Sequence, residues 1–430
     1  MEDKNIFTID SYGDECIEKT TISFKWIIER LEENSEDFRL KRKDSKVLKI
    51  TYEDISKGKG TASNIMKLVV FFDDVNNDPY KVILKVPIFK NSDLLNELGV
   101  KDIEKYDDNM VSNTLVRCHS QEHLFYREIS NEIKNIKVPK YYGGSDAILS
   151  KKSGVIIMDY VNPNKGGIID LNYPFNIYQA KSVIEEILKL HVFSFTNGKH
   201  WRSKLQNKRT IGLTTILQNI VKIHWDVCKE FIPKTILTEI EEDVINMISN
   251  FSEISLYNVY HLPESHGVNS VICHGDMWVN NILFHKDSKG RFTNDVMAIV
   301  DWQIIYEGSI GADLARNLAI NCSSEIRREI EISYLPQYFD RLKEEVLNKN
   351  ESFNITYETF KRHYDFCFIE SIFYLFVTIG YKLSQLDMSK ENESIWETRK
   401  FLLSSRIYFG IKDAVEKVKI LKPEWLIKKD

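Results

Sequence analysis

The sequence predicts an α+β protein with two lobes, an N-terminal lobe built on an antiparallel sheet with helices and a larger, mostly helical C-terminal lobe. Up to about residue 161 the chain is mostly strand-like, with apolar runs between turn signals. A turn-rich stretch follows at 162–167, and beyond it long helical periodicity dominates. We place the domains at 1–161 and 162–430, because 430 residues, 43% of them hydrophobic, can form two cores.

Composition excludes some partners. Lys and Arg number 58 against 63 Asp and Glu, so no basic excess favours nucleic acid. The six cysteines form no Cys-x-x-Cys pair and indicate free thiols in a reducing compartment. Residues 1–5 are not followed by an apolar core, so we expect no secretory signal, and no apolar run reaches the roughly 20 residues of a membrane span. We expect a cytoplasmic protein; the sequence does not indicate its oligomeric state.

The first elements in order are a helix near 21–35, a strand at 46–56, a turn and a returning strand at 65–72. The turn contains Gly58, Gly60 and Ser63. A hairpin with a small-residue tip lets backbone amides approach phosphate groups. A plain surface turn has the same composition, and both interpretations remain open at this point.

The next strand, at 80–87, carries a lysine inside an apolar run. Val82, Leu84 and Val86 share one face, which puts Lys85 on the other. An unpaired ammonium is costly in apolar surroundings, so Lys85 needs an anionic partner. The alternative is a lysine at the sheet edge whose head group reaches solvent.

A helix at about 113–136 offers that partner. Its apolar stripe recurs at steps of three and four, and Glu122 falls within the stripe. A carboxylate there pairs with Lys85 and leaves the ammonium directed at phosphate oxygens. Glu128 competes for this role, and either residue can be an ordinary exposed glutamate. The phase of the helix favours Glu122.

Beyond a further strand at 154–161, the chain is mostly helical. His191 lies on the apolar face of the first helix and is expected to be a core histidine. Helical periodicity covers these segments: 176–195, 211–252 with a break at Pro233, 311–320, 324–348, 356–386 and 393–418.

A loop between two buried strands interrupts this helical region. The apolar run 271–273 leads into His274-Gly275-Asp276, and a second apolar run follows Asn281. Phosphoryl transfer from ATP needs a carboxylate that accepts the proton of the attacking hydroxyl and a metal-binding amide nearby. Asp276 and Asn281 have these chemical groups.

A second acidic residue ends the strand at 296–300. A buried strand that ends in Asp301 places a carboxylate at a sheet edge, where it can bind a metal chelated by nucleotide phosphates. A metal-dependent hydrolase that uses His274, Asp276 and Asp301 is an alternative. It lacks further histidines at ligand spacing.

Together these motifs resemble the ecdysteroid kinase-like (CHK kinase-like) family of the protein-kinase-like fold, which is related to aminoglycoside and choline kinases. The resemblance runs in order over roughly residues 56–315. It rests on His274-Gly275-Asp276 with Trp278 and Asn281, on Asp301-Trp302-Gln303, on Asp313-Leu314-Ala315, and on the segment Gln121-Glu122-His123-Leu124-Phe125-Tyr126.

For the catalytic loop, the resemblance implies that Asp276 is the catalytic base. Asn281 and Asp301 are implied to bind Mg²⁺. His274 and Asp313 are implied to be structural, and Asp313 to accept hydrogen bonds from the loop backbone.

For the nucleotide, the resemblance implies that Lys85, braced by Glu122, holds the α- and β-phosphates of ATP. The segment from Gly58 to Ser63, with Gly60, is implied to cover the phosphates, although it lacks a full Gly-x-Gly-x-x-Gly. Residues 158–160, which are Met158, Asp159 and Tyr160, are implied to form the hinge against adenine.

The spacing bears on the acceptor. The step from Asp301 to Asp313 is too short for a peptide-docking activation segment, so we expect a small-molecule hydroxyl as acceptor. Aromatic residues are available for an apolar, steroid-like or lipid-like acceptor, although such density is also typical of a core: Trp278, Trp302, Phe366, Phe368, Phe373, Tyr374 and Phe376. A nucleotide-binding pseudokinase that acts as a regulatory module is the alternative function.

Overall fold

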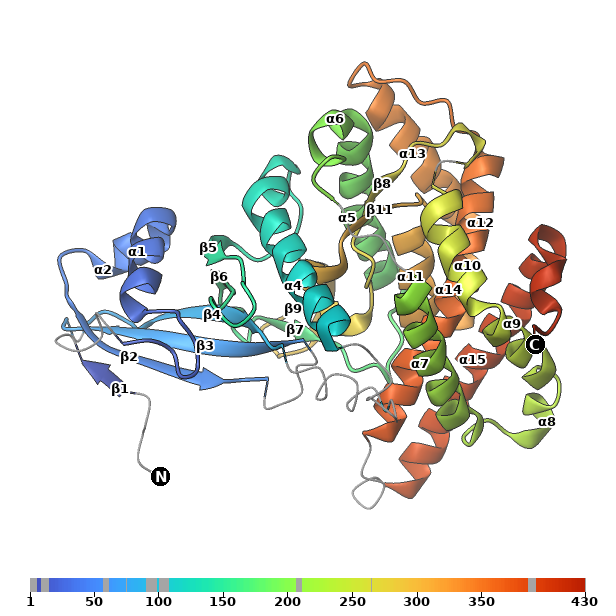
Figure 1. The fold of residues 1–430 in the computed structure, drawn as a ribbon, viewed down its shortest axis with the longest axis horizontal. Coiled ribbons are helices and arrows are strands. Elements are labelled where there is room, and N and C mark those ends of the chain that lie inside the picture. The colour runs from blue at the N-terminus through green and yellow to red at the C-terminus, as the bar shows by residue number, and fades with distance from the viewer. Residues whose placement is uncertain are drawn as a thin grey trace. The chain divides into compact units, whose positions relative to one another are not determined.

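The computed structural model describes residues 6–8, 15–56, 62–74, 76–89, 99, 108–205, 211–263, 265–385 and 392–429. The chain forms two compact units (Figure 1). Unit 1 comprises Met1–Glu97, Lys101–Glu132 and Val138–Pro163. Unit 2 comprises Leu98–Val100, Ile133–Lys137 and Asn164–Asp430. The first is built on an antiparallel sheet and the second is mostly helical, which confirms the predicted α+β class.

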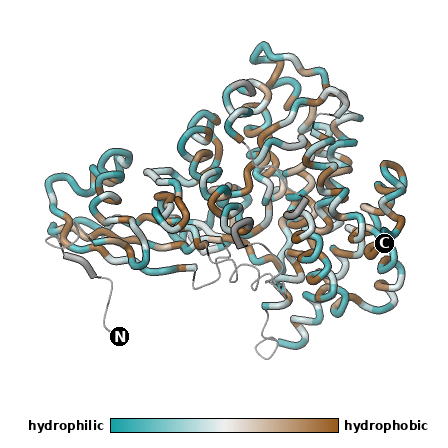
Figure 2. Tube along the Cα trace, viewed as in Figure 1, coloured by the Kyte–Doolittle hydropathy of each residue, from teal (hydrophilic) through white to brown (hydrophobic). Residues whose placement is uncertain are grey.

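Unit 1 is organised around a six-stranded sheet with the order β1-β2-β3-β4-β6-β5, in which every pair is antiparallel. The strands are β1 (Ile6–Thr8), β2 (Val47–Asp54), β3 (Ser63–Phe72), β4 (Tyr80–Pro87), β5 (Tyr141–Ser145) and β6 (Val155–Asp159). Hydrophobic and hydrophilic residues are interleaved along β2, β3 and β4 (Figure 2). Leu68, Val82 and Leu84 are fully buried, so one sheet face forms the core.

Two short helices begin unit 1, α1 (Phe24–Asn34) and α2 (Glu36–Arg42). Ser23 caps α1 by accepting a hydrogen bond from the Trp26 backbone. Ser35 ends α1 and caps α2, because its side chain accepts from the Phe38 backbone. Helix α2 was not predicted from the sequence.

The helix predicted for 113–136 changes its winding partway. Regular α-helix, α4, covers Asp108–Leu124, a π-helical turn covers Phe125–Ile129, and a 3₁₀ turn covers Ser130–Glu132. The predicted helix is therefore confirmed as far as Glu132, with a change of winding after Leu124, and is wrong for 133–136. The wider turn is closed by the backbone bond from Ser130 to Phe125, and it buries Phe125 and Tyr126 together.

Unit 2 contains two small antiparallel sheets. In one, β9 (Ile282–Lys286) lies between β10 (Phe292–Ile299) and β7 (Gly166–Ile168). In the other, β8 (Val271–Cys273) pairs with β11 (Tyr306–Gly308). The turn-rich stretch predicted as a linker thus ends in a strand, because Gly166 and Gly167 pair with His285 and Phe284.

The helices of unit 2 fall close to their predicted ranges. They are α5 (Ile177–Thr196), α6 (Gly198–Trp201), α7 (Ile211–Lys229), α8 (Lys234–Leu237), α9 (Glu241–Ser249), α10 (Phe251–Leu256), α11 (Ala312–Asn321), α12 (Ser324–Ser333), α13 (Leu335–Leu347), α14 (Tyr357–Ser384) and α15 (Glu393–Leu421). The single helix predicted for 324–348 is two helices, since Pro336 begins α13. His191 on α5 is fully buried and hydrogen-bonds the Tyr338 hydroxyl, as expected of a core histidine.

Helix α14 is the long central helix of unit 2 and packs against α7, α11 and α15. By length and composition it qualifies as a membrane-span candidate, with a mean hydropathy of 1.5 in its most apolar window. Of that window, 78% is buried inside the protein. A helix that is apolar on every face and enclosed by other helices is also what a core position requires.

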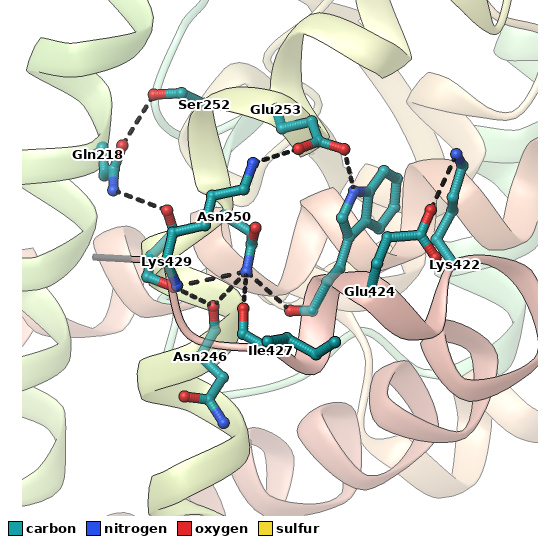
Figure 3. A network of polar contacts seen from close by, with 11 residues as sticks. Gln218, Asn246, Asn250, Ser252, Glu253, Lys422, Glu424, Ile427 and Lys429 are labelled. Carbon is teal, nitrogen blue, oxygen red and sulfur yellow. Dashed lines mark hydrogen bonds and ion pairs between the residues drawn. The ribbon is translucent and has the colours of Figure 1, made fainter.

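The C-terminal segment is fastened to α9 and α10 by the polar network in Figure 3. The Asn250 amide donates hydrogen bonds to the carbonyls of Trp425 and Ile427, at 3.2 and 2.8 Å. The Trp425 ring is fully buried, and its Nε1 donates to Glu253 at 2.9 Å. The last turn of the chain is thereby part of the core of unit 2.

Candidate active site

The loop after β8 is held by a carboxylate from another element. Asp313 lies in the first turn of α11, and its two oxygens accept hydrogen bonds from the backbone N–H groups of His274 and Gly275, at 2.6 and 3.0 Å. Asp313 is fully buried, and that burial raises the pKa of its carboxyl, while the two N–H groups oppose the rise. Asp313 thus accepts hydrogen bonds from the loop backbone, which is the contact that the resemblance implied for it.

Gly275 allows the loop to turn. Its φ is +83°, in the left-handed region that side chains with a Cβ disfavour. A Cβ at this position would lie 2.8 Å from the Ile304 carbonyl oxygen. The loop therefore requires glycine for two separate reasons.

His274 connects the loop to the segment that carries Asp301. Its Nδ1 accepts a hydrogen bond from the Asp276 backbone N–H at 3.1 Å, and its Nε2 lies 3.0 Å from the Val300 carbonyl oxygen. Since a carbonyl only accepts, Nε2 carries the hydrogen and the ring is the neutral Nε2–H tautomer. The ring also packs edge-on against Trp302, with centroids 4.6 Å apart. His274 thus has a structural role in this arrangement.

Asp276 and Asn281 are in direct contact. The Asn281 amide nitrogen donates to the Asp276 backbone oxygen at 2.9 Å and to its Oδ2 at 3.0 Å. As a whole residue Asp276 is partly exposed. Loss of hydration raises the pKa of its carboxyl, and the nearby Arg316 charge opposes that rise. The two residues, which lie five positions apart in the sequence, thus form one hydrogen-bonded pair.

Asp301 follows β10 in an unusual backbone conformation. Its φ and ψ are +68° and +56°, in the left-handed region, which Asp tolerates better than most residues. The neighbouring Val300 N–H donates to the Asn281 carbonyl at 2.9 Å, so the two predicted metal ligands lie on adjoining segments. The Gln303 amide donates to Asp301 Oδ2 at 3.3 Å.

These donors fit Mg²⁺ better than zinc. Magnesium is usually held by one or two protein oxygens together with phosphate and water oxygens, and Asn281 and Asp301 provide such a pair. Within the part of the chain that the structure describes, no group of three or more His, Cys, Asp or Glu side chains could hold a metal. The hydrolase alternative needs a cluster of that kind.

Unit 1 contains the second group of predicted residues. Lys85 Nζ and Glu122 Oε2 are 2.5 Å apart, and the exposed fractions of the two side chains are 8% and 1%. Lys85 does not reach solvent as an edge lysine would. Glu128 instead pairs with Arg127 at 2.6 Å. The partner of Lys85 in this ion pair is Glu122, the glutamate that the phase of the helix favoured.

The remaining nucleotide-site predictions lie on β3, on β6 and directly after it. Ser63 opens β3 opposite Pro87, whereas Gly58 and Gly60 lie outside the described residues. Met158 is buried between β4 and β5. Asp159 Oδ1 accepts from the Lys140 backbone at 2.7 Å, although burial still raises its pKa. Tyr160 has the ammonium groups of Lys67 and Lys81 within 6 Å of its ring centroid, at 5.9 and 5.8 Å.

One residue near Asp276 was missed by the sequence analysis. Arg316 is buried on α11, one turn after Asp313, and its guanidinium carbon lies 3.3 Å from the centroid of the Tyr374 ring. Arginine on a helix usually indicates a solvated face. The available signal was its spacing of three residues from Asp313, which places both on one helix face.

Comparison with known proteins places the chain in a family. A family model described as "Uncharacterized oxidoreductase dhs-27" (DUF1679) matches residues 39–406. The chain belongs to this family. The protein of that name from Caenorhabditis elegans is 26% identical over 324 residues, which are 74% of this chain and 38% of that protein. This DUF1679 chain therefore spans less than half of that relative.

A second C. elegans relative, named "Uncharacterized kinase-like protein D1044.1", is 23% identical to this family member over 80% of the chain and 87% of its own length. Among solved structures, a putative aminoglycoside phosphotransferase from Ralstonia eutropha is 12% identical, covers 90% of the chain and 98% of its own, and has a TM-score of 0.42. The ADP-bound aminoglycoside phosphotransferase APH(2'')-Ib is 14% identical over 87% and 98%, with a TM-score of 0.36.

Proposed function

We propose that this chain is an ATP- and Mg²⁺-dependent kinase that phosphorylates a hydroxyl group of a small molecule. The observation that carries the proposal is the loop in unit 2, where Asp276 contacts Asn281 while Asp313 fixes the backbone on one side and His274 on the other. A carboxylate and an amide in this relation are what phosphoryl transfer requires. The kinase-like name of one relative supports the proposal.

In the proposed reaction, Asp276 accepts the proton of the acceptor hydroxyl. The hydroxyl oxygen forms a bond to the γ-phosphorus, the bond from that phosphorus to the β,γ-bridging oxygen breaks, and ADP leaves with the electron pair. Asn281 and Asp301 would hold Mg²⁺, which neutralises phosphate charge when bound. The Lys85 ammonium, held by Glu122, binds phosphate oxygens.

The acceptor that we propose is a small alcohol, steroid-like or lipid-like as the ecdysteroid kinase-like resemblance suggests. Most of the aromatic residues considered for its pocket are core residues instead: Trp302, Phe366, Phe368, Phe373 and Phe376 are buried at 1% exposure or less. They fill the space between the packed helices. Trp278 and Tyr374 are partly exposed and stay available to an apolar acceptor.

The oxidoreductase name of the other relative has less support. The chain matches only 38% of that protein, and the name covers all of it. Dinucleotide-dependent oxidoreductases commonly bind their cofactor on a parallel sheet. Every pair of strands that the structure describes in this chain is antiparallel.

The test is turnover of labelled ATP with a broad metabolite panel. We expect the wild type to label an alcohol and Asp276→Asn to lower the rate by about 10²–10⁴-fold with nucleotide binding retained. Asp301→Ala should also lower the rate and raise the Mg²⁺ concentration needed for half-maximal activity. Full activity of Asp276→Asn would remove Asp276 from the role of base. Binding of Mg²⁺–ATP without turnover across the panel would favour the regulatory pseudokinase.

A further inference from the structure

Arg316 is a buried cation that lies near the charges of Asp276 and Asp313 without a hydrogen bond to either. Its exposed fraction is 7%, and its planar guanidinium lies over the Tyr374 ring. No hydrogen bond or ion pair joins this group to any residue that the structure describes, and Nε is one of the buried nitrogens without a partner. Burying donors without acceptors is costly, so such a group indicates a ligand.

Two other arginines of unit 2 show how a structural arginine is satisfied here. Arg327 is also buried and also lies over a ring of α14, but it pairs with Glu331 at 3.0 Å and with Asp413. Arg406 is buried and donates to backbone carbonyls, including that of Leu171 at 3.1 Å. Among these three buried arginines, Arg316 alone lacks an oxygen partner among the described residues.

The position of Arg316 says where its ligand binds. Asp313, one turn earlier on the same helix, holds the loop of Asp276. Further along α11, the Asn321 amide donates to the Met277 carbonyl of that loop at 3.2 Å. Along α11, Arg316 therefore lies between the two residues that hold the loop, Asp313 and Asn321. The Tyr374 ring restricts the guanidinium, because arginine stacks face-on with aromatic rings and then presents its fork of N–H donors sideways.

We infer that Arg316 binds an oxyanion beside Asp276, through the pair of oxygens that a carboxylate, phosphate or sulfate group presents. This anion site extends the proposed function, and it rests on that function for the identity of the group that carries the anion. One source is an acidic group on the acceptor, which would make the substrate an alcohol that also carries an acid. The other source is the phosphoryl group in transfer. Arginine suits either, because its fork matches paired oxygens.

The experiment is calorimetric titration of inorganic phosphate into the full chain at constant ionic strength. We expect one site whose affinity falls at least about tenfold, or roughly 1.4 kcal/mol, in Arg316→Gln. Arg328→Gln is the matched control: it removes the same charge from a half-exposed arginine of unit 2 and should bind as wild type does. Tyr374→Leu should weaken binding and Tyr374→Phe should preserve it, which tests the site without altering Arg316.

A second titration with a saturating, non-hydrolysable ATP analogue and Mg²⁺ distinguishes the two sources. Phosphate binding that persists identifies an acidic group on the acceptor, and binding that is lost identifies the γ-phosphoryl position. Unchanged affinity in Arg316→Gln, or no phosphate site in the wild type, would overturn the inference. If the analogue does not bind but the Arg316-dependent phosphate site remains, the proposed kinase function fails while the anion site stands.

Discussion

Gly275 shows how a single backbone angle supports the candidate loop. Gly275→Ala forces a Cβ into the left-handed region, which costs about 1–2 kcal/mol, and towards the Ile304 oxygen, which adds about 1–3 kcal/mol. We expect a lower free energy of unfolding, measured by urea titration. We also expect slower turnover in the proposed phosphoryl transfer, because the residue before Asp276 is displaced.

Gly290 provides the control. It has a similar φ of +76°, but a Cβ there meets nothing within 4 Å. Gly290→Ala should therefore cost only the conformational part, and activity should stay unchanged. Equal effects of the two substitutions would contradict the steric account of Gly275.

Residue spacing identified the pairs that act within one element or one loop. The five-residue spacing of Asp276 and Asn281 was enough to predict that they lie close together, because a short turn between two strands leaves few other conformations. The partner of Arg316 could not be found in this way. Tyr374 is distant in sequence, and only the packing of α11 on α14 brings the two together.

At the scale of elements, the ion pair between β4 and α4 is the strongest test. Glu122→Gln removes the carboxylate from the buried pair with Lys85, and removing one partner of a buried pair costs about 3–5 kcal/mol. We expect a clear fall in the denaturation midpoint of unit 1. Glu128→Gln, which disrupts the surface pair with Arg127, should cost less than about 1 kcal/mol. A larger effect at Glu128 would reverse the assignment.

Periodicity predicted which side of each element is buried better than it predicted where the winding changes. The stripe through Leu115, Cys118 and Glu122 is buried as expected. The π-helical turn that follows was missed, since an extra residue in one turn hardly alters a three-and-four pattern. Pro336 could have signalled the start of α13, because proline is common at the first helical positions.

At the scale of the molecule, the change from strand-like to helical sequence predicted two structural regions. The structure assigns Leu98–Val100 and Ile133–Lys137 to unit 2, and the chain passes between its units for the last time at Pro163–Asn164. The order of the strands in the sheets could not be predicted from the sequence. β4 pairs with β6 rather than with β5, the next strand in sequence, and β7 joins β9 after a separation of more than a hundred residues. Alternation specifies a buried face and leaves the partner strand open.

The C-terminal segment tests how far the core of unit 2 depends on contacts between distant parts of the sequence. Trp425 is fully buried against the rings of Tyr257 and Phe366, and Asn250 hydrogen-bonds the backbone around it. We expect Trp425→Ala to cost about 3–5 kcal/mol of folding free energy, because it leaves a large cavity.

Lys429→Met is the comparison, since it removes only a half-exposed ion pair with Glu253 from the same segment and should cost less than about 1 kcal/mol. The measurement is the urea midpoint of both variants, followed by proteolysis, which should cleave near α9 in Trp425→Ala alone. If both variants unfold as the wild type does, the segment is an appendage and the core of unit 2 is complete without it.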